Sequence, residues 1–169
     1  CNNTVDITTD FNRPGVGVET NSVAGAAIGL LVQNDNKVTV NGAAAEAVGM
    51  GNYDTSDLVN LTTIDNHIFN GNHIVTNGVP VQFYAQGKNP GDMGGNHLES
   101  TSVTSPAFVV RGYSDLAWSN NHAVATAAAM AALGANLFRD VDKLTIARGS
   151  ATNSYYNGYQ LLTVAEHNV

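Results

Sequence analysis

The stretch AIGLLVQNDNKVTV, residues 27–40, carries the clearest local signal for secondary structure in this chain. Its centre, Asn34-Asp35-Asn36, is typical of a turn, and apolar residues alternate with polar ones after it. If the turn joins two antiparallel strands, Val32 lies opposite Val38. The stretch therefore predicts a β-hairpin with one apolar face.

A second hairpin is predicted around Asn77-Gly78, because both residues tolerate the positive φ angles of a tight turn. This turn sets Ile74 opposite Val81. Pro80 marks the second strand as an edge strand, since proline has no N–H to donate to a neighbour. The glycine-rich stretch 88–96 that follows is interpreted as a loop.

Further strands are predicted at 108–111, 144–147 and 160–164, whereas the segment from about 120 to 143 has helical periodicity. It is rich in Ala, and its larger apolar residues recur every three or four positions: Met130, Leu133, Leu137 and Val141. Gly134 leaves open whether the segment is one helix or two. The expected fold class is α+β and mainly β, an antiparallel sheet or sandwich of hairpins with one Ala-rich helical segment in the C-terminal third.

Residues 1–12 are expected to form an extended N-terminal arm, and residues 13–169 a single β-rich globular domain. Val5, Ile7 and Thr8 belong to a stretch of alternating apolar and polar residues, which is typical of a strand. These three residues are the candidates for contacting a neighbouring molecule, and the alternative is that the arm folds back on its own domain.

One short internal echo occurs, in which Asn66-His67-Ile68 is followed by Asn72-His73-Ile74. Solenoid proteins repeat units of about 20 to 50 residues several times. The echo is shorter than that, so it is interpreted as two consecutive turn signals and not as a repeat architecture.

The surface is predicted to be poor in charge, because charged residues make up 12% of the chain, about half the usual share. Asn supplies about one residue in eight instead. Weak like-charge repulsion favours close packing of identical copies. The net charge of −7 and the scattered basic residues disfavour nucleic acid as a partner, and no stretch has the length and apolarity of a membrane span.

Cys1 is the single cysteine and stands first in the sequence, which is typical of a processed chain. It is a possible lipid attachment site, an ordinary residue left by cleavage, or an N-terminal nucleophile whose own amine acts as base. Together with sequons at Asn2 and Asn60, this position favours an extracellular or cell-surface location.

Candidate metal ligands are few. Calcium accepts oxygen ligands, so Asp54 and Asp57 form a possible calcium site, although no other cofactor is expected. A zinc site at His67 and His73 is disfavoured, since a turn between them directs the two side chains to opposite faces of a sheet.

Three functional classes therefore stay open. A structural protein that self-assembles into a filament, coat or layer through its arm fits the low charge best. A binding module for glycan or protein would use aromatic side chains, namely Trp118, Tyr113 and the pair Tyr155-Tyr156. A hydrolase with Cys1 as nucleophile is the third.

Overall fold

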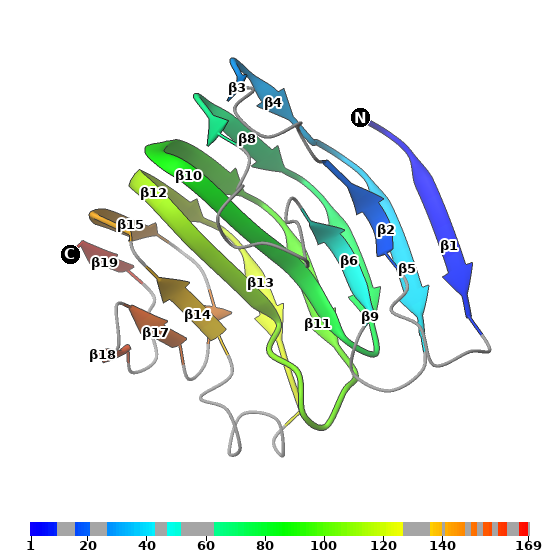
Figure 1. Ribbon diagram of the computed structural model, residues 1–169. Helices are drawn as coiled ribbons and strands as arrows, with labels where there is room; N and C mark the ends of the chain where they lie inside the picture. Colours follow the sequence, from blue (N-terminus) through cyan, green and yellow to red (C-terminus); the bar gives the residue numbers. More distant parts are fainter. Residues whose placement is uncertain are drawn as a thin grey trace.

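The structure is a computed structural model that describes residues 1–9, 16–20, 27–42, 47–51, 63–126, 136–139, 141–147, 150–151, 154–156, 159–161 and 166–168. These residues form β-strands joined by turns and contain no helix. The chain winds in successive coils, so that strands from neighbouring coils lie side by side and run in parallel (Figure 1). The architecture is a parallel β-solenoid.

One wall of the solenoid, called sheet A here, has six parallel strands, one from each coil. In spatial order these are β1 (Thr4–Thr8), β5 (Lys37–Asn41), β9 (His73–Thr76), β11 (His97–Ser100), β13 (His122–Val124) and β16 (Ser150–Ala151). Side chains alternate between core and surface along β5, β9 and β11.

The larger sheet, sheet B, is organised by two long strands, β10 (Val79–Gly94) and β12 (Phe108–Ser119), which pair with each other in parallel. Shorter strands extend the sheet beside the first halves of β10 and β12. Next to β10 lies β6 (Val48–Gly51), followed by β2 (Val16–Glu19). Next to β12 lies β14 (Asn136–Arg139), followed by β17 (Ser154–Tyr156). The second half of β10 pairs with β8 (His67–Asn70), which in turn pairs with β4 (Leu31–Val32). The second half of β12 pairs with β15 (Lys143–Ala147).

Short strands complete sheet B at its margins. β3 (Ala27–Ile28) and β7 (Thr63–Ile64) pair with each other in parallel, and β7 also meets β10. Near the C-terminus, β18 (Tyr159–Leu161) and β19 (Glu166–Asn168) run antiparallel to β17 and β15. Among the described strands, antiparallel pairing is therefore confined to β18 and β19.

The corner between the two sheets has the same backbone form in four coils. In these coils a residue in the left-handed region follows β4, β8, β10 or β12: Asp35 with φ 55°, Gly71 with 67°, Gly95 with 64° and Asn120 with 52°. Gly, Asn and Asp are the residues that adopt this region most readily. Each is followed by an asparagine and then by a strand of sheet A. The corner therefore redirects the chain into the other sheet instead of reversing it into a hairpin.

The asparagines after these corners stack into a buried ladder that ties the coils together. Asn36, Asn72 and Asn96 each donate through Nδ2 to the side-chain oxygen of the next asparagine along the axis, at 2.8–2.9 Å, and the ladder ends at Asn121. Asn3 joins it at 3.1 Å from Asn36. The same oxygens accept the backbone N–H of the preceding rung. Buried polar groups cost stability unless bonded, so the ladder makes the stacking of coils specific.

The space between the sheets is filled by apolar side chains, with aromatic rings stacked along the axis. Trp118 lies 4.5 Å from Phe108 and 5.2 Å from Phe138, measured between ring centroids, and Phe69 lies 5.0 Å from Phe83. All five rings are at most 1% exposed. One continuous core therefore runs through the described coils.

Both predicted hairpins are wrong, and with them the antiparallel fold class. Val32 pairs with Ile68 in sheet B and Val38 pairs with Ile74 in sheet A, both in parallel. The second hairpin fails in the same way, because Ile74 and Val81 belong to different sheets. The turn residues were identified correctly, but turn chemistry alone does not distinguish a corner from a reversal.

Pro80 and the expected loop are also corrected. Pro80 lies within β10, which has β6 on one side and β12 on the other, so it is not in an edge strand. Residues 88–94 continue β10 as strand, and Gly91 and Gly94 pair with β8. Glycine is needed at Gly91 because a Cβ there would come within 2.8 Å of the Tyr113 ring.

The Ala-rich helix predicted for about 120–143 is wrong for the part that the structure describes. Residues 122–124 form β13 and residues 136–139 form β14, while residues 127–135 lie outside the described residues. The signals for a helix here were the Ala-rich composition and the helical spacing of apolar residues. Strand pairing with β11 and β12 overrides them.

The echo at 66–78 does belong to a solenoid, contrary to its interpretation as turn signals. Its two halves are β8 and β9, consecutive strands of one coil. The relevant repeat is the corner asparagine, which recurs after 36, 24 and 25 residues, from Asn36 to Asn72, Asn96 and Asn121. Among the described residues, moreover, there is no helix with the length and apolarity needed to cross a membrane.

Candidate functional surfaces

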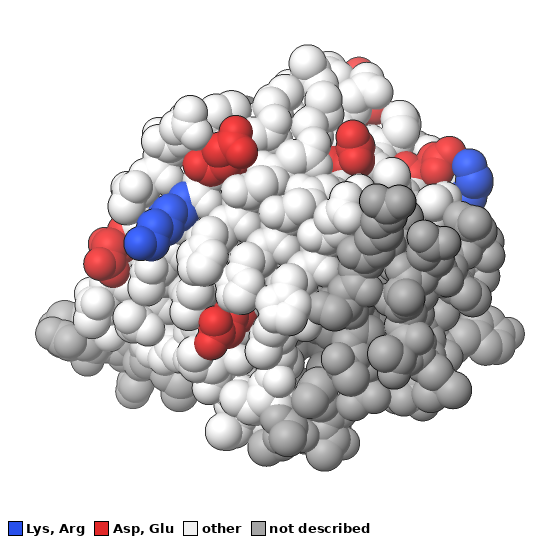
Figure 2. Space-filling model, turned by 180° about the vertical axis from the view of Figure 1, so that it is seen from behind, with Lys and Arg blue, Asp and Glu red and all other residues white. Residues whose placement is uncertain are grey.

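The described surface is sparsely charged. Figure 2 shows one face, on which acidic and basic side chains stand as isolated groups on a mostly uncharged background. Lys143 contacts Asp115 at 3.0 Å, and His97 contacts Glu99 at 3.3 Å. The first contact is more than half exposed at both ends, so it contributes at most about 1 kcal/mol.

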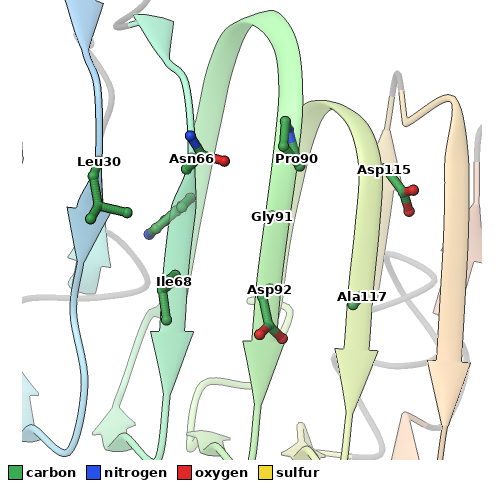
Figure 3. Close-up of a pocket in the computed structure, with 9 residues that line it drawn as sticks. Leu30, Asn66, Ile68, Pro90, Gly91, Asp92, Asp115 and Ala117 are labelled. Atoms are coloured by element: carbon green, nitrogen blue, oxygen red, sulfur yellow. The ribbon is translucent and has the colours of Figure 1, made fainter.

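A groove with a volume of about 480 Å³ lies on the outer side of β4, β8, β10 and β12 (Figure 3). The strand register aligns Ile68, Asp92 and Ala117 in one row across these strands. A second row of residues lines the groove two positions before the first row in the sequence: Leu30, Asn66, Pro90 and Asp115. The groove therefore runs along the solenoid axis, across several coils.

The groove combines aliphatic and acidic side chains. Leu30 is 58% exposed, which is unusual for a large apolar residue, and Ile68 and Pro90 continue the apolar surface beside it. Asp92 and Asp115 supply carboxylates on adjacent strands, two register positions apart. Asp115 is paired with Lys143, whereas Asp92 is an exposed carboxylate for which the described part of the chain supplies no ion pair.

Directly beneath the groove, His67 belongs to a buried chain of polar side chains. Its Nε2 lies 3.0 Å from Gln33 Oε1, and its Nδ1 lies 2.7 Å from the Tyr113 hydroxyl. Gln33 in turn donates to the Thr20 hydroxyl at 3.1 Å, which orients its oxygen toward His67. A neutral His67 therefore carries its proton on Nε2 and accepts from Tyr113.

Burial controls the ionisation of this pair. It lowers the pKa of His67 to about 3 and raises the pKa of Tyr113 well above its usual value. Both side chains are thus neutral near pH 7. Because both ring nitrogens of His67 are already bonded, His67 has no free nitrogen to offer a ligand in the groove.

On sheet A, three histidines occupy the same position in successive coils and form an external column. The rings of His73 and His97 stack at 4.6 Å with planes 9° apart, and His122 follows at 5.2 Å. Lys37 occupies the corresponding position one coil earlier. Partial burial lowers the pKa of His73, as do the charges of His97 and Lys37, while Glu99 opposes the shift.

The edge of sheet A at β1 is a third surface. Lys37 donates its N–H to the carbonyl of Asn3 at 2.8 Å, and Thr9 donates to Asn41 at 2.9 Å. In a parallel pair, backbone groups of alternate residues face the same neighbour. The even-numbered residues Thr4, Asp6 and Thr8 therefore point their N–H and C=O groups away from β5, and no strand among the described residues pairs with them.

The candidate arm residues lie in β1, which pairs with β5 of the same chain. Val5 and Ile7 are half-buried and pack against the core, and Thr8 is exposed. Sequence reasoning identified the strand correctly. Of the two arrangements left open by the sequence, the structure shows the one in which the strand packs on its own domain.

Other predicted site residues are not brought together. Cys1 is exposed and does not line the groove, and Asp54 and Asp57 lie outside the described residues. His67 points into the core, whereas His73 points outward. Within the described part of the chain, no group of three or more His, Cys, Asp or Glu side chains is arranged to hold a metal ion.

Two of the aromatic residues expected to bind glycan, Trp118 and Tyr113, do not form a surface, and the side chains of Tyr155 and Tyr156 lie outside the described ones. Trp118 and Tyr113 are both 0% exposed, so neither ring can stack on a ligand. Comparison of the chain with protein-family models, with curated proteins and with solved structures finds no match. The groove, the histidine column and the β1 edge are therefore recognised from geometry alone.

Proposed function

We propose that this chain is a structural solenoid of the extracellular space or cell surface, and that it self-assembles through the free edge of β1. The observation that carries the proposal is the outward direction of the backbone groups of Thr4, Asp6 and Thr8. An unpaired strand edge is a template for pairing with a strand of another molecule. The low surface charge supports the proposal, because copies of the chain repel one another weakly.

The proposed contact between copies is pairing at the outer edge of β1, in place of the free N-terminal arm that the sequence predicted. Val5 and Ile7 already pack on their own core, so releasing them would expose apolar surface to water. Pairing at the outer edge leaves these contacts intact. The neighbour would add a strand to sheet A as the next coil does within the chain.

The proposed assembly is head-to-tail, because β1 and β16 are the two ends of sheet A. A contact between unlike ends repeats without closing and gives a filament. A contact between two β1 edges would instead close a symmetric dimer. Particle size as a function of protein concentration separates these two arrangements.

Proline substitution tests the edge directly, because it removes one N–H at a chosen side of the strand. Asp6→Pro removes an N–H from the free edge, which an edge strand tolerates, and is expected to weaken association at least about tenfold with the circular dichroism spectrum unchanged. Ile7→Pro is the matched control. It removes an N–H that faces β5 and is expected to lower thermal stability instead.

Light scattering and electron microscopy of the native protein provide the measurement. The proposal expects filaments whose length grows with concentration and which Asp6→Pro shortens or abolishes. A strictly monomeric particle, a dimer of constant size, or wild-type filaments from a folded Asp6→Pro variant would each contradict it.

A further inference from the structure

The groove on sheet B has features that no part of the assembly proposal uses. It lies on β4, β8, β10 and β12, whereas the proposed assembly edge belongs to sheet A. Its occupant would therefore be a separate partner. The size, shape and chemistry of the groove restrict what that partner can be.

We propose that this groove binds an extended peptide segment that carries aliphatic residues at one end and Lys or Arg residues at the other. Four adjacent strands separated by about 4.8 Å span about 14 Å, which matches about four residues of extended chain at about 3.3 Å each. The volume of about 480 Å³ falls within the usual range for ligand sites.

Charge favours a basic ligand. Asp92 and Asp115 line the groove, and no Lys or Arg is found among the described residues that do so. Asp92 is the stronger candidate for binding a cation, because Asp115 is already paired with Lys143 at 3.0 Å.

Apolar contacts favour a peptide over a sugar. Leu30 is 58% exposed at one end of the groove, and Ile68 lies beside it in the same surface. Exposed aliphatic side chains suit the aliphatic side chains of a peptide. Sugars are commonly bound on aromatic rings, and the one ring among the described lining residues, His67, is buried and faces the core. The amide of Asn66 can bond the backbone of an extended peptide.

Fluorescence anisotropy with a labelled tetrapeptide, acetyl-Leu-Leu-Lys-Lys-amide, tests the proposal, because its first and third side chains face the same way when the peptide is extended. Binding is expected to weaken as salt is added, and the Glu counterpart, acetyl-Leu-Leu-Glu-Glu-amide, is expected not to bind. Asp92→Asn is expected to weaken binding about three- to fivefold, in keeping with an exposed ion pair. Leu30→Asn is expected to weaken it by a similar factor, and folding should be unaffected because Leu30 is mostly exposed.

Glu99→Gln is the matched control, since it removes one negative charge from sheet A and leaves the groove intact. It is expected to leave the affinity for the Lys peptide unchanged. Equal weakening by Glu99→Gln and Asp92→Asn would show a non-specific attraction and overturn the proposal. Binding of the Glu peptide, or binding of a neutral glucose hexasaccharide without binding of the Lys peptide, would overturn it as well. None of these results depends on whether Asp6→Pro disrupts assembly.

Discussion

Asn72 donates from Nδ2 to Oδ1 of Asn96 at 2.9 Å inside the core, although 24 residues separate the two in the sequence. The same amide also donates to the carbonyl of Gln33 at 2.8 Å. One side chain thus joins three consecutive passes of the chain. Hydrogen bonds of this kind act along the axis of the solenoid, in addition to the backbone bonds between strands.

Replacing Asn72 by Ala is expected to destabilise the fold by about 3 kcal/mol or more, because it removes four hydrogen bonds and leaves buried partners without one. Urea unfolding followed by the fluorescence of Trp118, the single tryptophan, measures the change. Asn66→Ala is the control. Asn66 is exposed, so a change within about 0.5 kcal/mol is expected, and equal losses from the two variants would argue against the ladder.

Gly78→Ala is expected to destabilise the protein by about 3 kcal/mol through overpacking. A Cβ at Gly78 would meet the backbone of Ala47, including its amide nitrogen at 2.6 Å, and backbone atoms cannot move aside as a flexible side chain can. Gly29→Ala provides the comparison, since a Cβ there meets nothing within 4 Å. Thermal unfolding of both variants checks the prediction, and equal melting temperatures would contradict it.

The stability of the fold is expected to decrease as the pH falls from about 6.5 toward 3. Burial lowers the pKa of His67 to about 3, so the folded state holds the ring neutral while the unfolded chain takes up a proton. Stability from this source is complete above pH 6.5 and is lost at about 1.4 kcal/mol per pH unit below it. The His67→Gln variant has no titrating group at this position, so its free energy of unfolding should depend less steeply on pH. Equal slopes, or an NMR titration of the His67 ring near 6.5, would refute the prediction.

The histidine column predicts opposite effects of two neighbouring charges. Lys37 helps to lower the pKa of His73 and Glu99 raises it. Lys37→Ala should therefore raise the pKa of His73, and Glu99→Gln should lower it further. NMR titration of the imidazole signals measures both. Shifts in the same direction would mean that the column is not coupled to its neighbours as described.

The sequence pattern predicted several strands correctly but not their partners. Alternation identified the strand at Thr4–Thr8, because it reports which residues face the core. The strands predicted at 108–111 and 144–147 lie within β12 and β15. Alternation says nothing about which strand lies alongside. The decisive signal was the recurrence of a left-handed residue, then Asn, then Lys or His, as at Asp35-Asn36-Lys37 and Gly71-Asn72-His73. This pattern recurs at uneven intervals, so it does not show as a repeat of fixed length in the sequence.

The surfaces were harder to predict than the strands. Asp92 and Asp115 are separated by 23 positions and become neighbours only through the register of β10 and β12. The same holds for the column, since His73, His97 and His122 align only when the coils stack. Trp118 and Tyr113 illustrate the converse: their aromatic character suggested a binding surface, and their burial in the core excludes it.

Amide hydrogen exchange at residues 4–8, measured at low and at high protein concentration, tests most directly whether copies pair through β1. In dilute protein, the N–H groups of Val5 and Ile7 should be protected by β5, and those of Thr4, Asp6 and Thr8 should exchange rapidly. At concentrations where particles form, pairing through the edge should slow the exchange of the three even-numbered amides at least about tenfold. Rapid exchange at Thr4, Asp6 and Thr8 within assembled particles would show that the chain associates by another surface.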